Sequence, residues 1–464
     1  MTVTVVVIFA IVYLGMIVGG LPFLQLDRTG VALLGAIALV TIGDLTPEQA
    51  ASSIHLPTLL LLFSFMVLSA QMRLGGFYAW VTQHIAALPL GPSALLAAVI
   101  VTVAVLSAVF SNDIVCLAVA PVLADACLRR GLDPVPFLLA LACAANIGSA
   151  ATLIGNPQNM LIGTVLKLSF GSYLLEAIVP VVFGLAALWA LLALQARRRW
   201  HVPSADPPAY TASDTPLDRW QTGKGLGVAL ALIVVFLFTD LPRDVAALTG
   251  AGVLLMSRRL HSTATLGLVD WELLILFIGL FVVNHAFEHT GLSAQAVQAL
   301  AAHGFTLTEP APLFVATLAL SNIVSNVPAV MLLLPAATQP FAGPMLALVS
   351  TLAGNLFIVG SIANIIVVDA ARKQGITIDW RRHLRIGLPV TIATLAITAV
   401  WFVWRTPSLA AASAAATSEA DRHCVDCVGR WRNECLPQLC GTGITSVRGT
   451  GLGTKTASSR PPRT

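Results

Sequence analysis

Charged residues are scarce in this chain. Only 10% of its 464 residues are Asp, Glu, Lys or Arg, whereas a soluble globular protein carries about 25%. Hydrophobic residues make up 57% of the chain, and the mean hydropathy is +0.86. These values exclude an ordinary soluble protein and predict a polytopic membrane protein.

Several functional signatures are also missing. The sequence has no Walker motif and no Gly-x-Ser-x-Gly, and we find no nucleophile–base set or metal-ligand set within its apolar segments, so we do not expect an enzyme. Its start, MTVTVVV, has no basic region, which argues against a cleaved signal peptide. The net charge of +4 comes from short basic loops, so we expect no nucleic-acid partner. Three of the seven cysteines lie in apolar segments, where burial makes them inert: Cys116, Cys127 and Cys143.

Long apolar segments separated by short polar loops fill most of the chain. We predict an all-α polytopic membrane protein with about ten transmembrane helices plus two re-entrant hairpins, arranged as two inverted repeats. The first repeat covers residues 1–195, with a hairpin at 93–128 and a broken helix at 135–165. The second covers residues 225–404, with a hairpin at 313–341 and a broken helix at 344–369. A linker loop at 196–224 divides them. For residues 93–128 the alternative is one long helix with a polar notch.

The basic residues predict an orientation. Cytoplasmic loops collect Lys and Arg. If residues 197–199 lie in the cytoplasm, the other basic loops fall on the same side and both termini lie outside. The first hairpin then opens inward and the second outward, so the two halves have opposite orientations. We therefore predict a multi-pass protein of the cell inner (cytoplasmic) membrane.

Two polar interruptions repeat at a spacing of about 205 residues inside apolar runs. In lipid, a helix break persists only where protein or a water-filled cavity covers its freed backbone groups. A matching pair of interrupted segments in two halves is therefore a pointer to a transporter's binding site. The shared positions are Gly155 with Gly360, Asn156 with Ser361 and Asn159 with Asn364.

The predicted hairpin tips supply a second pair of polar sequences, Ser111-Asn112 and Ser325-Asn326, each followed by a proline nine residues after the Asn. Half-helix N-termini attract anions, and unwound carbonyls with Ser and Asn oxygens suit a small cation. The alternative is that such side chains only bridge packed helices, but a duplicated set favours a site. The predicted substrate and ion site comprises Ser111, Asn112, Asp113, Thr152, Gly155, Asn156, Asn159, Ser325, Asn326, Gly360, Ser361 and Asn364, with Asn146 and Asn355 lining the approach.

Asp113 is a carboxylate at a predicted tip in an otherwise apolar stretch. An acidic residue inside the membrane is a functional hypothesis, because it could ligate a cation or carry a proton. The alternative is that it caps the following half-helix. The second half has Val327 at this position, so the two tips are not chemically equal. We expect no cofactor and no structural metal, apart from a coupling H⁺ or a Na⁺ held by Asn112, Asp113 and Asn156.

Two further polar groups stand apart from this site. His285, Glu288 and His289 cluster near a span end, where we expect a solvated interfacial group rather than a proton path. Residues 405–464 form a Gly/Ser/Arg-rich tail that we expect to be disordered. The alternative is a zinc site, for which the tail offers Cys424, Cys427, Cys435 and Cys440.

Residues 56–404 resemble the ion transporter superfamily, which includes divalent anion/sodium symporters, citrate-transporter-like permeases and arsenite-efflux permeases. The resemblance rests on Ser111-Asn112, on LIGNPQN at residues 153–159, on SNVPA at residues 325–329 and on Gly360-Ser361-x-x-Asn364. It implies a scaffold domain, a moving transport domain with two hairpins, elevator-type alternating access and a homodimer. The sodium–dicarboxylate branch has Ser-Asn-Thr at both tips. This chain has Asp113 and Val327 as third residues, which is closer to the Asn-Asp form of the arsenite permeases.

Together these features predict a secondary active transporter that moves a small inorganic or carboxylate anion, coupled to a Na⁺ or H⁺ gradient. Alternatives are an arsenite/antimonite efflux permease, a Na⁺/H⁺ antiporter, and a membrane sensor or scaffold that does not transport. The expected partners are the small anion, the lipid bilayer and a second copy of the chain.

Overall fold

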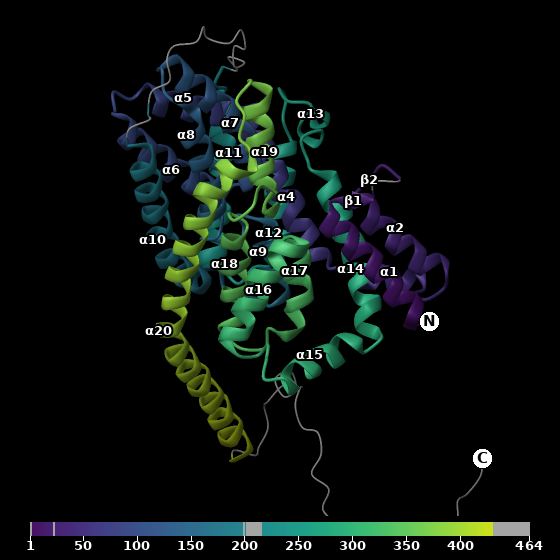
Figure 1. Ribbon diagram of the computed structural model, residues 1–464. Coiled ribbons are helices and arrows are strands. Elements are labelled where there is room, and N and C mark those ends of the chain that lie inside the picture. The colour runs from purple at the N-terminus through teal and green to yellow at the C-terminus, as the bar shows by residue number, and fades with distance from the viewer. Residues whose placement is uncertain (1, 22–23, 198–199, 201–215, 430–464) are drawn as a thin grey trace, which may run out of the picture. The chain divides into compact units, whose positions relative to one another are not determined.

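The computed structural model describes residues 2–21, 24–197, 200 and 216–429, and for residues 406–429 it describes the backbone only. It divides into two compact units, Met1–Ala410 and Ala411–Thr464. Within the described part the chain is almost entirely helical, apart from a two-residue antiparallel ladder of β1 (Gly20–Leu21) and β2 (Leu26–Asp27). Figure 1 shows the order of these elements.

The helices of the first half, with bounds as the structure has them, are α1 (Thr2–Val18), α2 (Arg28–Thr41), α3 (Pro47–Ser53), α4 (Leu56–Leu74), α5 (Phe77–Ala87), α6 (Pro92–Val109), α7 (Asn112–Arg129), α8 (Pro134–Ser149), α9 (Pro157–Val165) and α10 (Phe170–Ala196). Those that follow are α11 (Arg219–Phe238), α12 (Arg243–Leu255), α13 (Ser262–Leu266), α14 (Trp271–His289), α15 (Leu292–Ala302), α16 (Pro310–Val324), α17 (Asn326–Leu333), η1 (Leu334–Ala336), α18 (Ala342–Ala353), η2 (Ile358–Gly360), α19 (Ile362–Lys373) and α20 (Trp380–Gly429).

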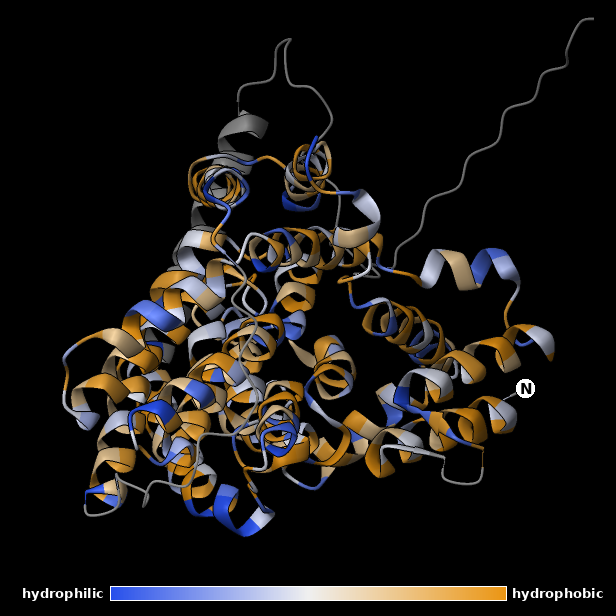
Figure 2. Cartoon of the chain, turned by 90° about the horizontal axis from the view of Figure 1, so that it is seen from above, coloured by the Kyte–Doolittle hydropathy of each residue, from blue (hydrophilic) through white to orange (hydrophobic). Residues whose placement is uncertain are grey.

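Six of these helices are long and apolar enough to cross a membrane by length and composition: α4, α6, α10, α11, α14 and the first part of α20. Six shorter apolar segments accompany them. Figure 2 shows hydrophobic residues along most of the helices. The prediction of an all-helical polytopic membrane protein is therefore confirmed.

Four pairs of helices meet at short interruptions. α6 ends at Val109 and α7 begins at Asn112, while α16 ends at Val324 and α17 begins at Asn326. α8 and α9 are separated by residues 150–156, and α18 and α19 by residues 354–361. Ser, Asn or Gly stands at each of these interruptions of the apolar runs, and those residues weaken a helix. The chain does not run through residues 93–128 as one long helix.

The first pair of helices is held along its length by α5. At the far end from the interruption, Arg130 donates hydrogen bonds to the carbonyl oxygens of Ala86 (2.7 Å), Leu88 (3.2 Å) and Leu90 (2.8 Å). At the interruption, the ring of Phe110 packs edge-on against Tyr78 with centroids 5.9 Å apart. The segment around α5 therefore contacts the α6–α7 pair at both ends and supports one side of it.

Close backbone contact brings the broken segments together. A Cβ on Gly148 in α8 would lie 2.3 Å from the Cα of Ala104 in α6, so only glycine permits this approach. The helix α19 packs against both α7 and α8, and α18 packs against α9. Segments from the two halves of the sequence therefore surround one centre.

The C-terminal region is described in part. α20 extends from Trp380 to Gly429, past residue 404, where we predicted the last span to end. Cys435 and Cys440 lie outside the described residues, as do residues 198–199 and 201–215 of the predicted linker. The predictions of a disordered tail, of a zinc site there and of a linker between repeats therefore stay predictions.

Candidate functional site

Four helix N-termini face the centre where the interruptions meet. They belong to α7, α9, α17 and α19, and their first residues or N-caps are the predicted site residues Asn112, Asn156, Asn326 and Ser361. The carboxyl ends of α6, α8, α16 and α18 lie at the same interruptions. Amide groups at helix N-termini carry partial positive charge and carbonyls at C-termini partial negative charge. The centre therefore offers both kinds of partner, and no Lys or Arg is among the buried residues that the structure describes.

Asn146 of α8 is the hub of this centre. Its side-chain nitrogen donates to the side-chain oxygens of Asn355 (2.9 Å) and Asn364 (3.2 Å). Its side-chain oxygen accepts from the hydroxyl of Ser361 (2.9 Å) and from the amide of Asn112 (3.4 Å). The hub joins the first helix pair to the second broken segment, so it links groups more than 200 residues apart in the sequence.

A second set of hydrogen bonds closes the first break, which is the interruption between α8 and α9 at residues 150–156. Asn156 caps α9 by accepting from the backbone N–H of Asn159 (2.9 Å), and its amide donates to the hydroxyl of Ser149 (3.0 Å). The amide of Asn159 donates to the carbonyl of Thr152 (3.0 Å) and to the hydroxyl of Tyr173 (3.2 Å). Both asparagines are buried, so these bonds satisfy groups that lipid could not.

Side-chain hydrogen bonds to the backbone also close the second break, which is the interruption between α18 and α19 at residues 354–361. The amide of Asn364 donates to the carbonyls of Gly354 (2.8 Å) and Phe357 (3.0 Å), which belong to the unwound backbone. Asn326 of the second tip lies against this break, because a Cβ on Gly354 would be 3.1 Å from its amide nitrogen. A Cβ on Gly360 would lie 3.1 Å from the carbonyl oxygen of Gly354. The small residues here allow backbone and side chain to pack closely.

The first tip, at the interruption between α6 and α7, contacts the first break through backbone atoms. The N–H of Asn112 donates to the carbonyl of Gly155 at 3.2 Å. A Cβ on Gly155 would lie 2.3 Å from the carbonyl oxygen of Ser149, so this position requires glycine. The hydroxyl of Thr152 donates to the carbonyl of Ala108 in the last turn of α6. The backbone N–H of Ser111 donates to the hydroxyl of Ser69 in α4 at 3.3 Å.

Ser325 forms the second tip in a strained conformation, with φ +80° and ψ 162°. Few non-glycine residues adopt positive φ, and such strain persists only where surrounding structure holds it. Its carbonyl accepts the N–H of Ala329 at 3.1 Å and so starts α17. The structure therefore places every predicted site residue at one of the four interruptions. That they bind substrate or ion stays a prediction.

Several buried polar atoms at the centre have no hydrogen-bond partner within the described structure. They include two acceptors, the side-chain oxygens of Asn112 and Asn326, and one donor, the amide nitrogen of Asn355. Native proteins seldom leave such atoms unpaired, and each one calls for an explanation such as an ion or ligand. The orphaned atoms are neutral acceptors and donors, which suits a ligand that is small and polar.

Asp113 occupies the second position of α7. It makes no hydrogen bond or ion pair in the part of the chain that the structure describes, so the alternative of a helix cap is not what the structure shows. Its carboxylate is half-buried and lies within electrostatic reach of Asp270, the N-cap of α14. An uncompensated carboxylate of this kind is free to meet a cation or a proton.

Four further residues at this centre were not predicted as site residues: Ser149, Thr351, Gln158 and Tyr173. Thr351 accepts from the amides of Gln158 (3.1 Å) and Asn156 (3.3 Å), which joins the two broken segments a second time. A signal existed for Thr351, since at the spacing of about 205 residues it is the counterpart of Asn146. Tyr173 lies on the next helix and carries no local signal.

His285 and Glu288 lie away from this centre. They line a cavity of about 330 Å³ between the end of α14 and the end of the α16–α17 pair, together with His55 and Met331. The rings of His285 and His289 meet edge-on at 4.4 Å. Among the described residues no group of three or more His, Cys, Asp and Glu side chains could hold a metal ion.

The chain is similar in sequence to several known membrane proteins. The chain is 30% identical to a silicon efflux transporter from rice, Oryza sativa subsp. japonica, over 84% of this chain and 95% of that protein. It is 29% identical to a 46 kDa membrane protein of Mycobacterium leprae over 82% and 94%, and 24% identical to a putative transporter, arsB, of Dictyostelium discoideum over 81% and 87%.

A solved structure shares the fold. The crystal structure of the Alcanivorax borkumensis YdaH transporter, described as having an unusual topology, superposes with a TM-score of 0.51 at 15% identity. The match covers 88% of this chain and 98% of that one. A family model described as citrate transporter matches residues 5–353. The chain therefore belongs to the citrate transporter family of membrane transporters, as the sequence motifs predicted.

Proposed function

We propose that this protein is a secondary active transporter that moves a small inorganic or carboxylate anion across the cytoplasmic membrane, coupled to a Na⁺ or H⁺ gradient. The observation that carries the proposal is the convergence of four helix N-termini on a buried centre that has no Lys or Arg among its described residues. Such a centre attracts an anion through backbone amides, and it can release the anion again because no fixed positive charge holds it.

The coupling ion finds its partners at the same centre. The unpaired side-chain oxygens of Asn112 and Asn326 are neutral ligands of the kind that a small cation prefers. Asp113 follows Asn112 directly and supplies a negative charge that either a cation or a proton would neutralise. A cation there also offsets the charge of the anion, which gives the two solutes a reason to bind together. We propose Asn112, Asp113 and Asn156 as the region of this cation.

We further propose an elevator-type movement in a homodimer. Asn146 and Thr351 tie the two broken segments to each other, which favours displacement of the whole centre as one body. The first helix pair is joined to the same centre through Asn112. A movement that separated the two breaks would leave several buried polar groups unpaired in a lipid environment.

Efflux is the second candidate function. One of the relatives is described as a silicon efflux transporter, and a weakly acidic or neutral oxyacid would fit the neutral amide-lined centre. An arsenite or antimonite exporter belongs to the same class of chemistry. A Na⁺/H⁺ antiporter would need Asp113 alone, without an anion at the N-termini.

The test is flux through purified protein in liposomes, preceded by thermal stability measurements against a ligand panel. The panel comprises sulfate, phosphate, succinate, citrate and arsenite, each with sodium or potassium and at two pH values. A ligand that binds only the folded protein raises the melting temperature by mass action. A rise that needs sodium would support the symporter, and one that follows pH alone would support proton coupling. Absence of flux for every anion and cation would overturn the proposal in favour of a sensor or scaffold.

A further inference from the structure

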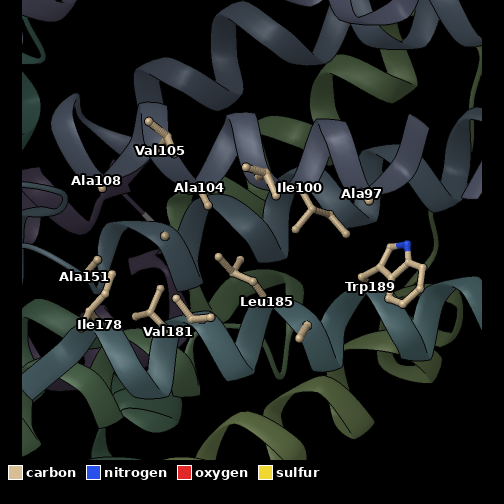
Figure 3. Close-up of a pocket in the computed structure, with 14 residues that line it drawn as sticks. Ala97, Ile100, Ala104, Val105, Ala108, Ala151, Ile178, Val181, Leu185 and Trp189 are labelled. Carbon is tan, nitrogen blue, oxygen red and sulfur yellow. The ribbon is translucent and has the colours of Figure 1, made fainter. Parts of the chain in front are cut away.

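An apolar groove of about 440 Å³ runs along the outer side of α6, α8 and α10, away from the hydrogen bonds described above. Figure 3 shows it between α6 and α10, from Ala97 and Trp189 at one end to Ala108 and Ala151 at the other. Small residues form its floor, where Gly148 lets α8 approach the backbone of Ala104. Bulkier side chains form its walls, and no charged side chain lines it.

The walls of the groove continue into surface that would face lipid. Val101 and Val105 of α6 are 58% and 59% exposed, and Val182 of α10 is 54% exposed. Both α6 and α10 are long and apolar enough to cross a membrane. In a bilayer, therefore, the molecules beside this groove are the acyl chains of lipids.

The length of the groove matches one leaflet. From Ala97 to Ala108 the helix rises about 16 Å at 1.5 Å per residue. The hydrocarbon core of a bilayer is about 30 Å thick, so one leaflet is about 15 Å deep. The far end of the groove reaches the last turn of α6, beside the interruption at Ser111. A groove of this length can hold a single lipid acyl chain along the full depth of one leaflet, and it ends near the middle of the bilayer.

The open end of the groove carries the marks of a membrane interface. The indole N–H of Trp189 donates to the carbonyl of Ser93 at 3.1 Å, and tryptophan is enriched where the hydrocarbon meets the headgroups. Three exposed arginines lie on the segments that continue past this end of the groove. The guanidinium of Arg130 donates to the carbonyl of Leu90, just before the start of α6. Arg197 lies at the end of α10. The backbone carbonyl of Arg385 accepts a hydrogen bond from the side chain of Gln195, near the end of the same helix.

We propose that the groove binds one acyl chain of an anionic phospholipid, with the headgroup among these arginines and the end of the chain beside Ala108 and Ala151. Positive charge at the rim complements a phosphate and an anionic headgroup. The acyl chain of the lipid fills an apolar space whose floor supports the first tip and the first break. The carbonyl of Ala108 accepts from Thr152, so the end of the lipid lies one residue layer behind the candidate site.

Loss of the groove tests the proposal directly. In Ala186→Phe the new ring fills the groove, and the exposed position of Ala186 leaves the fold intact. The matched control is Ala231→Phe, which adds the same ring to an exposed position of α11 outside the groove. Native mass spectrometry of detergent-purified protein with added phosphatidylglycerol would count bound lipids. We expect Ala186→Phe to retain one lipid fewer per chain than wild type, and the control to retain the same number.

Two further measurements keep the result unambiguous. A phosphatidylglycerol with a photoreactive group at its chain end should crosslink the wild-type protein at residues 104–108 or 148–151. Arg197→Gln with Arg385→Gln should reduce the preference for phosphatidylglycerol over phosphatidylethanolamine. Equal lipid retention in Ala186→Phe and Ala231→Phe, or crosslinks confined to other helices, would overturn the proposal. So would conversion of a dimer to a monomer by Ala186→Phe with unchanged lipid, because the groove would then be an interface between copies.

Discussion

Replacing Asn146 with alanine removes the hub of the candidate site. Four hydrogen bonds end on its side chain, two donated and two accepted. The partners are buried, so no bulk water replaces the lost bonds. The variant should therefore lose both stability and ligand binding, since the positions of Asn364 and Ser361 depend on this side chain.

The size of the stability loss depends on how hydrogen bonds behave inside a membrane protein. Measured coupling energies between membrane helices average about 0.6 kcal/mol and reach about 1.7 kcal/mol. Four bonds at the average value give a loss of about 2.5 kcal/mol, and at the upper value about 7 kcal/mol. The 3.4 Å bond from Asn112 is long and should contribute least. We expect a loss of about 2 to 4 kcal/mol for Asn146→Ala.

Asn284→Ala is the matched control. Asn284 is also a buried asparagine, but it lies on α14 and accepts one good hydrogen bond, from the hydroxyl of Tyr13 at 2.8 Å. Its loss should cost about 0.6 kcal/mol and leave ligand binding intact. Unfolding by a denaturing detergent in mixed micelles measures both losses. Equal losses for the two variants, or ligand-dependent stabilisation that survives in Asn146→Ala, would refute the role given to Asn146.

Three further predictions concern single residues. Asp113→Asn should abolish coupled transport while the protein folds normally. The control Asp125→Asn, on the same helix, should transport normally, because the Asp125 carboxylate pairs with Arg129 near the far end of α7. Near-normal coupled flux in Asp113→Asn would contradict the assigned role. Gly155→Ala should fail to bind ligand, since its Cβ would lie 2.3 Å from a backbone carbonyl oxygen, and an unchanged melting temperature would show that the break is looser than described. Arg243→Gln should lower the melting temperature without changing ligand preference, because its guanidinium donates to the carbonyl of Gly163 in the last turn of α9 (2.9 Å) and to that of Leu168 just beyond it (2.7 Å). The loss should be about 1.5–3 kcal/mol, which a thermal unfolding scan would detect, and a changed ligand preference would place Arg243 in the site instead.

The helix ends at the centre were predictable because composition controls them locally. Ser111 and Asn112 weaken the helix at the first interruption, and Gly155 and Asn156 do so at residues 150–156, so both interruptions follow from sequence alone. The end of α20 was not predictable in the same way. Residues after 404 are rich in alanine, which favours helix without regard to the membrane boundary.

The partners of the site residues were less predictable than their identities. The repeat indicated Asn156 and Asn159 as a pair with Ser361 and Asn364. It could not indicate that Asn146 would bond all across the centre, because that depends on how α8 packs against α19. Tyr173 closes the first break from another helix, and nothing in the spacing of an aromatic residue on a long apolar helix distinguishes it from a core residue.

The short helix α5 has a mechanical consequence for the first helix pair. It is attached to that pair twice, by Arg130 at the far end and by the contact of Tyr78 with Phe110 at the tip. The pair cannot swing or shorten without taking α5 with it. The link from α5 back to α4 is Gly76, whose left-handed backbone (φ +72°) makes it the natural pivot. A label on α5 should therefore keep a constant distance to α7 through the transport cycle, while its distance to α4 changes.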